Sequence, residues 1–128
     1  MRVLVCGGRD FDNYVFVRDT LYALCDEFGL WYPEDEYGNT LPTVEIIHGG
    51  CPSGADKCAD EFAIVNWCKF QEFKADWDKH GRAAGPIRNQ KMLEEGRPDL
   101  VLAFRGGRGT ADMIRRAEKA GIEVRKIP

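Results

Sequence analysis

The chain has 128 residues, of which 44% are hydrophobic and 30% are charged, and this composition is typical of one globular domain with a full core. Its net charge of −3 argues against broad nonspecific binding to nucleic acid, which needs many cations against the phosphate backbone. No apolar run is long enough to span a membrane and no signal-peptide pattern is present, so we expect one domain over residues 1–128 without a membrane segment.

The five cysteines are odd in number, and no two of them have C-x-x-C spacing. This usage predicts reduced thiols in a cytoplasmic protein. Cys25 and Cys58 fall on apolar helix faces and are predicted to lie in the core, whereas Cys51 falls in a glycine-rich turn. Because no set of residues has the spacing of metal ligands, we expect neither a metal ion nor another cofactor.

Short apolar runs alternate with amphipathic stretches along the chain. The runs predict strands at residues 2–6, 44–48, 70–73, 99–104 and 122–127. The amphipathic stretches predict helices at residues 13–28, 53 to about 68, 87–95 and 110–120, and residues 77–86 are expected to form a loop. This alternation predicts a three-layer α/β fold with helices on both faces of one parallel sheet, whose five strands take the order 3-2-1-4-5.

Residues 31–43 interrupt the alternation between the first helix and the second strand. The segment combines turn residues, acidic residues and aromatic residues without a regular period. This pattern predicts a loop insertion with a hairpin around Gly38-Asn39. A surface insertion is the favoured interpretation, and a lid over a binding site is the alternative.

Three of the predicted strands end in paired glycines that lead into a helix, within residues 3–10, 46–56 and 100–110. In an open parallel sheet, all three junctions meet at the carboxyl edge of the strands, where ligands bind. Glycine lets the backbone approach a ligand closely, and the first N–H groups of a helix are unpaired and attract an anion. The repeated pattern therefore predicts a site for a phosphate-bearing ligand.

The junction glycines are the candidate backbone contacts, namely Gly7, Gly8, Gly49, Gly50, Gly54, Gly106, Gly107 and Gly109. Ser53 and Thr110 stand at helix starts, where each could cap the helix or contact an anion, and Asp56 completes a capping-box pattern with Ser53. The run 106–110 is not a P-loop, because no Lys-Ser/Thr pair follows it, and it lacks the dinucleotide fingerprint G-x-G-x-x-G. A purely structural turn is the alternative interpretation of that run.

Four polar side chains near these turns are further candidates. Arg88 offers a bidentate fork for a phosphate or a carboxylate, with a surface salt bridge as the alternative. Asn89 could bond a base or a sugar, or instead satisfy the loop backbone. Arg9 is a candidate phosphate partner, and Asp10 could cap a helix or bind a ribose hydroxyl.

Other residues have a structural interpretation that competes with a functional one. His48 ends a strand, and we favour a buried structural histidine over a catalytic one. Trp77 is interpreted as a packing residue rather than a stacking platform. Asp76 and Asp78 flank it and are either helix caps or acid–base groups.

Taken together, the motifs form an ordered set along nearly the whole chain: G-G-R-D-F at 7–11, H-G-G and G-A-D within 48–56, A-D-W at 75–77, G-R-A-A-G-P-I-R-N at 81–89 and G-G-R-G-T-A-D-M at 106–113. This set resembles the YspA/cpYpsA-related branch of the SLOG superfamily. The resemblance implies a Rossmann-like fold and a pocket for a nucleotide or a nucleotide-derived ligand. Relatives in that superfamily include the Lonely Guy phosphoribohydrolases, which activate cytokinins, and a DNA-processing protein that loads recombinase.

The resemblance to the Lonely Guy enzymes covers only part of their pattern. Their P-G-G-x-G-T-x-x-E motif aligns with residues 105–113, where Arg105 replaces the proline and Met113 replaces the catalytic glutamate. Asp112 comes one residue early, which is about 100° of rotation on a helix, so we expect it to point away from the site. Arg88 and Met92 match their R-x-x-x-M stretch. The resemblance therefore implies the binding half of such a site without its acid.

The first hypothesis is a binding domain that senses or processes a nucleotide-derived ligand. The rival is an enzyme that cleaves an N-glycosidic bond in a nucleoside monophosphate, with its acid drawn from Asp10, Asp76, Asp78 or Asp112. A module for single-stranded nucleic acid is opposed by the negative charge and by the lack of an aromatic–basic stripe. The sequence leaves open whether the ligand is hydrolysed and whether the chain forms a homo-oligomer.

Overall fold

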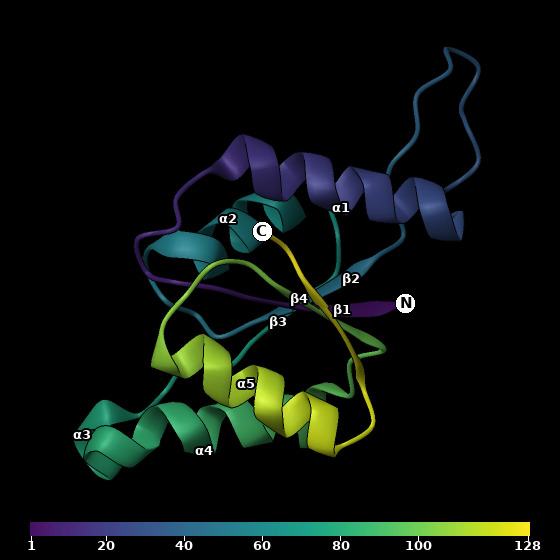
Figure 1. Cartoon of the computed structure of the whole chain (residues 1–128). Coiled ribbons are helices and arrows are strands. Elements are labelled where there is room, and N and C mark those ends of the chain that lie inside the picture. Colours follow the sequence, from purple (N-terminus) through teal and green to yellow (C-terminus); the bar gives the residue numbers. More distant parts are fainter.

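Five parallel strands form the centre of the computed structural model, which describes all residues from 1 to 128 (Figure 1). The strands are β1 (Arg2–Cys6), β2 (Glu45–His48), β3 (Phe70–Glu72), β4 (Leu100–Ala103) and β5 (Glu123–Lys126). They lie in the order β3-β2-β1-β4-β5, and every neighbouring pair is parallel. The predicted α/β class and the predicted strand order are therefore confirmed, and the arrangement is Rossmann-like.

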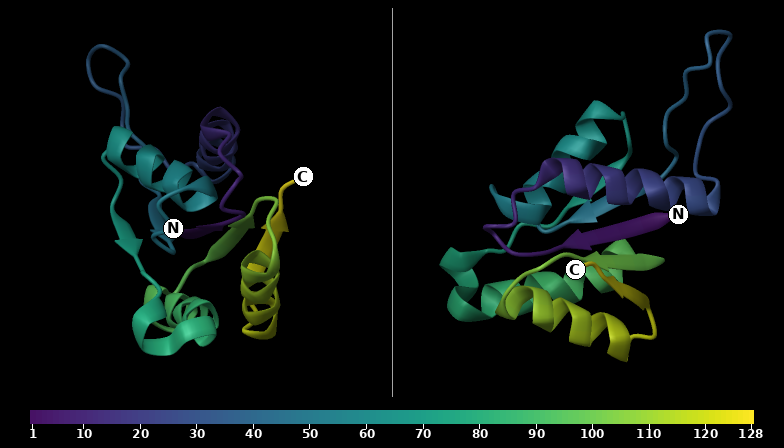
Figure 2. Two further views of the ribbon diagram at one scale, coloured as in Figure 1. Left: turned by 90° about the vertical axis from the view of Figure 1, so that its left-hand side faces the viewer. Right: turned by 45° about the horizontal axis from the view of Figure 1, so that its top comes forward.

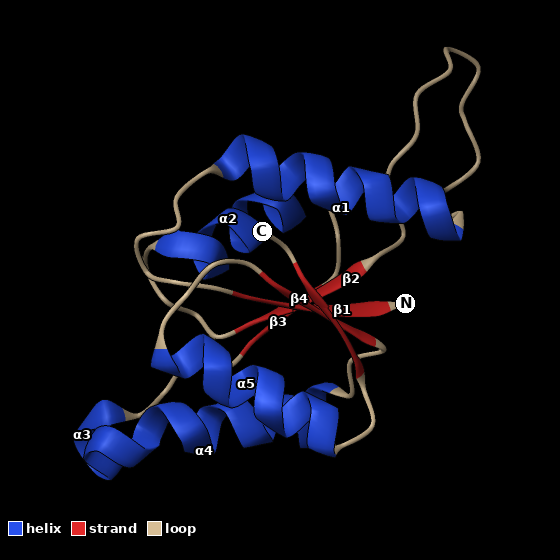
Figure 3. Cartoon of the chain, in the orientation of Figure 1, coloured by secondary structure: helices blue, strands red, loops and turns tan.

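Helices cover both faces of the sheet (Figures 2 and 3). On one face lie α1 (Tyr14–Phe28) and α2 (Gly54–Val65), and on the other lie α4 (Ala84–Lys91) and α5 (Arg108–Lys119). Shorter helical pieces are α3 (Trp77–His80), η1 (Gly81–Ala83) and η2 (Met92–Gly96). None of these helices has the length and hydrophobicity that a membrane span requires.

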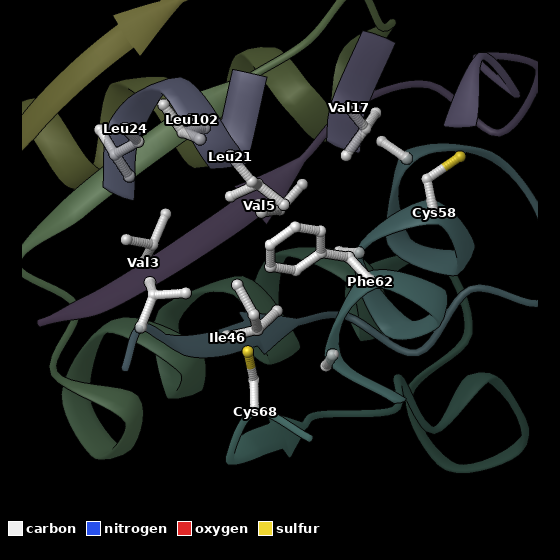
Figure 4. Close-up of a cluster of buried hydrophobic side chains, with 14 of the residues drawn as sticks. Val3, Val5, Val17, Leu21, Leu24, Ile46, Cys58, Phe62, Cys68 and Leu102 are labelled. Atoms are coloured by element: carbon white, nitrogen blue, oxygen red, sulfur yellow. The ribbon is translucent and has the colours of Figure 1, made fainter. Parts of the chain in front are cut away.

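Successive side chains of the central strand β1 point to opposite faces of the sheet, and each face has its own hydrophobic core. Val3 and Val5 of β1 pack against α1 and α2, whereas Leu4 and Cys6 pack against the helices of the other face. Because the sheet is covered on both faces, nearly every residue of the central strands is buried, and the strands read as continuous apolar runs. Figure 4 shows the ring of Phe62, from α2, at the centre of the first core.

The loop predicted for residues 77–86 is wrong, because this segment consists of α3, η1 and the start of α4. Asp76 caps α3 by accepting a hydrogen bond from the Lys79 N–H over 3.0 Å. Gly81 has a φ of 55° and is the C-cap of α3, where the chain passes directly into η1. Pro86 lies in the first turn of α4, where its missing N–H costs nothing.

Residues 31–43 form an arm that projects from the body beside the end of α1 (Figure 1). Trp31 and Pro42 pair at its base as an antiparallel bridge. At its tip, the Asp35 carboxylate accepts hydrogen bonds from the N–H groups of Tyr37 and Asn39, both over 2.8 Å. Because the arm follows α1 and precedes β2, it lies at the amino edge of the strands and does not cover the opposite edge as a lid.

The first core yields a stability prediction. Phe62→Ala is expected to lower the free energy of unfolding by about 3–5 kcal/mol, since it leaves a cavity among fully buried side chains. Ile64→Ala on the same helix is the control, because Ile64 is 61% exposed and its loss is expected to change stability by no more than about 0.5 kcal/mol. Urea denaturation followed by circular dichroism measures both variants, and similar losses in the two would contradict this packing.

Candidate functional site

A cleft of about 1290 Å³ opens at the carboxyl edge of the sheet, where β1, β2 and β4 end. Its wall includes every residue predicted to bind ligand except Gly54: Gly7, Gly8, Arg9, Gly49, Gly50, Ser53, Arg88, Asn89, Gly106, Gly107, Gly109 and Thr110. Gly54 lies behind the wall. The three glycine junctions therefore meet in one place.

The junctions touch one another directly. The Gly8 N–H donates to the carbonyl oxygen of Arg105 over 2.7 Å, and the Ala55 N–H donates to the carbonyl oxygen of Gly8 over 3.3 Å. A Cβ atom on Gly54 would collide with the backbone of Gly8 and Arg9, and one on Gly106 would lie 2.7 Å from the Gly8 nitrogen. Gly54 also has a φ of 73°, which disfavours any side chain. These glycines are required for packing of the turns.

Gly107 and Gly109 are different, because a Cβ on either would meet no protein atom within 4 Å. Their lack of side chains leaves open space at the beginning of α5. The N–H groups of Arg108, Gly109 and Thr110, in the first turn of this helix, donate to no protein acceptor. Together with the helix dipole, they make this end of α5 attractive to an anion.

Arg88 projects from α4 toward the turn after β2. Its Nη1 donates to the carbonyl oxygen of Gly49 over 2.6 Å, and its Nε donates to Asn89 Oδ1 over 3.0 Å. Burial lowers the pKa of Arg88, while nearby Asp56 opposes that shift, and the guanidinium stays charged. Nη2 has no partner in the protein. The surface salt bridge considered as an alternative is absent.

Asn89 links α4 to α5, and both polar atoms of its side-chain amide are hydrogen-bonded within the protein. Its Nδ2 donates to the Gly109 carbonyl oxygen over 3.2 Å and to Asp112 Oδ2 over 3.0 Å, while its Oδ1 accepts from Arg88. The arrangement fixes the start of α5 relative to the guanidinium of Arg88. Asn89 is therefore a positioning residue in this structure.

The expected orientation of Asp112 is wrong. Asp112 lies in the cleft wall, whereas Met113 is fully buried in the second core. The helix starts at Arg108, and its buried stripe runs through Thr110, Met113 and Ala117 at helical spacing. Asp112 therefore falls beside the cleft, on the side of α5 that faces α4.

Asp112 is also fully occupied. It accepts hydrogen bonds from Asn89, from Arg115 over 2.7 Å and from Arg116 over 2.8 Å. Burial favours a higher pKa, but the hydrogen bonds from Asn89 and Arg116 outweigh it, so the pKa of Asp112 is lowered. This carboxylate stays ionised and carries no proton to donate.

Asp56 is a cleft residue that the sequence analysis assigned to a cap. Ser53 stands at the N-cap position of α2, but its side chain makes no capping bond, so the predicted capping box is wrong. Asp56 instead turns back and accepts the Cys51 N–H over 3.2 Å, which holds the turn after β2. Burial raises the pKa of Asp56, although the Cys51 N–H and Arg88 oppose the shift.

Charge in the cleft is opposite in sign to that of the whole chain. Six basic side chains line it against three carboxylates, which are Asp10, Asp56 and Asp112. None of the six basic side chains forms a salt bridge. Only Arg9 and Arg88 were predicted from the sequence as ligand-binding, whereas Lys74, Arg82, Arg105 and Arg108 were not. Arg105 and Arg108 could have been predicted, because both lie next to or within the glycine run at 106–109.

Of the remaining candidate histidine and aspartate residues, one lies in the cleft wall and the others lie outside it. His48 is buried as expected: its Nδ1 accepts the Gly50 N–H and its Nε2 donates to Asp60, each over 3.0 Å. Asp10 is exposed in the cleft wall without a hydrogen-bond partner, whereas Asp76 caps α3 outside it. Asp78 also lies outside the wall. No group of three or more His, Cys, Asp or Glu side chains is arranged to hold a metal ion.

Comparisons with known proteins identify the family of the chain. The model of the YspA, cpYpsA-related SLOG family matches residues 1–80. The chain is also 38% identical over 133 residues to the Gene 61 protein of Mycobacterium phage D29, an alignment that covers 96% of this chain and 93% of the phage protein. The chain belongs to the YspA, cpYpsA-related SLOG family.

The burial of Asp56 predicts a pH-dependent gain in stability for Asp56→Asn. Because the pKa is raised on folding, stability from this group is present below the ordinary aspartate value of 3.8 and is lost as the pH rises through the folded value. The asparagine oxygen can still accept the Cys51 N–H. We expect the variant to be more stable than the wild type at pH 7 and the difference to shrink below pH 3.8.

Urea unfolding of both proteins across this pH range measures the effect. Glu61→Gln is the control, since Glu61 is exposed on the same helix and has no ion-pair partner. A destabilised Asp56→Asn variant at pH 7 would show instead that the charge of Asp56 is needed to hold the turn.

Proposed function

We propose that this member of the SLOG family binds a nucleotide or a nucleotide-derived ligand in the cleft, through its phosphate, as a sensor or a processing domain. The observation that carries the proposal is the set of six basic side chains without a salt bridge in one cleft of a chain whose net charge is −3. Because these six cations outnumber the three carboxylates of the cleft, the excess positive charge is repulsive, and an anionic ligand relieves that repulsion.

The backbone supports a phosphate rather than a diffuse anionic surface. The open end of α5 presents unpaired N–H groups beside two glycines that leave space for a close approach. Arg88 is already fixed by Gly49 and Asn89, so its remaining Nη2 is oriented before any ligand arrives. A preorganised guanidinium loses little conformational entropy when it binds a phosphate oxygen.

Hydrolysis of an N-glycosidic bond is the second candidate function, and Asp56 is the observation in its favour. General acid catalysis needs a carboxyl group with a raised pKa near the scissile bond. Asp112 is ionised and occupied, and Met113 is buried in the core. Asp56 has a raised pKa on the cleft wall, but its accepted Cys51 N–H already gives it a role in the turn. Binding is therefore the primary proposal.

Arg88→Ala tests the binding proposal. The variant is expected to weaken binding of nucleoside 5′-monophosphates by about 1.5–3 kcal/mol, the range for a hydrogen bond to a charged group. Isothermal titration calorimetry measures the affinity, and a thermal melt verifies that the variant is folded. Arg18→Ala is the control, because Arg18 lies on α1 outside the cleft wall. Equal affinity in wild type and Arg88→Ala would remove Arg88 from the site.

A second experiment separates binding from hydrolysis. Prolonged incubation of the wild type with adenosine, guanosine, cytidine and uridine 5′-monophosphates is expected to release little free base, because no free acid stands where the related enzymes carry theirs. Chromatography of the mixtures measures the base. Rapid release that disappears in Asp56→Asn, Asp10→Asn or Asp112→Asn would make hydrolysis the primary function and identify the acid.

A further inference from the structure

Two aromatic side chains line the cleft, and their surroundings differ. Phe11 packs against the first core and stacks on Phe104 at a centroid distance of 5.3 Å. Trp77 belongs to neither core cluster and is 48% exposed. Trp77, interpreted from the sequence as a packing residue, therefore packs only in part, and about half of its side chain stays exposed inside a strongly polar cleft.

The ring of Trp77 is nevertheless held in place. Asp76 caps the short helix that carries it, and the Cη2 edge of the ring lies against Gly85 in the first turn of α4. A Cβ on Gly85 would lie 3.4 Å from Cη2, which is van der Waals contact. The ring is thus supported along an edge, while much of its surface stays accessible.

Arg9 lies over the ring, with its guanidinium carbon 5.6 Å from the ring centroid. The Arg9 side chain forms no salt bridge and no hydrogen bond within the protein, and its cation–π contact is with this tryptophan. A planar ring placed between the two groups needs about 7 Å, or two contacts of about 3.5 Å each. An exposed and unpaired arginine can make this room with a shift of about 1–2 Å, which follows from that spacing.

We infer that Trp77 and Arg9 form a clamp that stacks the base of a nucleotide whose phosphate binds at the start of α5, an inference that rests on the proposed function. The two faces of a base can stack on the indole ring of Trp77 and on the guanidinium of Arg9. A sugar phosphate without a base has no such face. The clamp selects for an aromatic ring and accepts every base. Purines overlap the indole over a larger area than pyrimidines and bind more tightly.

The test compares two probes that share a phosphate but differ in the base. Adenosine 5′-monophosphate and ribose 5-phosphate are titrated calorimetrically into the wild type, Trp77→Ala and Trp77→Phe. Trp77→Ala is expected to weaken binding of the adenosine monophosphate by about 5-fold to 150-fold, the range for loss of one base–aromatic stack. Ribose 5-phosphate is expected to bind equally to all three proteins, and Trp77→Phe is expected to restore part of the lost affinity.

Trp67→Ala is the matched control, because Trp67 is 84% exposed and lies outside the cleft wall. A Trp31→Phe, Trp67→Phe variant leaves Trp77 as the single tryptophan, and its fluorescence is expected to fall on addition of adenosine monophosphate but not of ribose 5-phosphate. This measurement needs no alanine variant, so it holds even if Trp77→Ala unfolds.

The outcomes separate the clamp from the binding site itself. Equal affinity of wild type and Trp77→Ala for adenosine monophosphate would overturn the clamp and leave phosphate binding intact. Equal losses for both probes in a folded Trp77→Ala would also overturn it, since the tryptophan would then support the phosphate site rather than the base. Failure of the wild type to bind any nucleoside monophosphate would overturn the proposed function and the clamp together.

Discussion

The site depends on direct contact between backbone turns that come from different parts of the sequence. The Gly8 N–H bonds the carbonyl oxygen of Arg105, and the Gly8 carbonyl oxygen bonds the start of α2. Side chains at Gly8, Gly54 or Gly106 would push these turns apart. Once the turns are in contact, the start of α5 and the turn after β2 face the same cleft. The geometry of the cleft is thus set by backbone atoms rather than by mobile side chains.

Side chains of α4, on the other face of the sheet, also hold these turns in place. Arg88 bonds the turn after β2, while Asn89 bonds the start of α5. The two neighbouring residues of α4 therefore connect elements that the chain separates widely. Asp56 holds the same turn from behind through the Cys51 N–H. Polar groups bonded in this way have little freedom, so the guanidinium of Arg88 is presented to the cleft in a nearly fixed position.

Features that depend on local pattern could be predicted from the sequence. Buried parallel strands give apolar runs and glycine turns mark their carboxyl ends, so the strand order and the meeting of three turns followed from the alternation of elements. Features that depend on the rotation of a helix about its axis or on tertiary contacts could not be predicted from the sequence. The helix at 77–80 is only four residues long and has no period to detect, which concealed the exposure of Trp77. The side chain of Asp56 fits a cap in sequence, and only the folded turn shows that it bonds Cys51 instead.

The orientation of α5 about its axis also explains why the resemblance to the Lonely Guy phosphoribohydrolases does not extend to their catalytic glutamate. Met113 and Ala117 on α5 are part of the second core, so residue 113 faces the sheet. A glutamate at that position would be buried among apolar side chains unless α5 rotated, and rotation would break the bonds between Asn89 and the start of the helix. The loss of the acid is therefore tied to the packing of α5 as well as to one residue. Of the three carboxylates in the cleft wall, Asp112 is ionised and hydrogen-bonded, so an acid that serves this cleft has to come from Asp10 or Asp56.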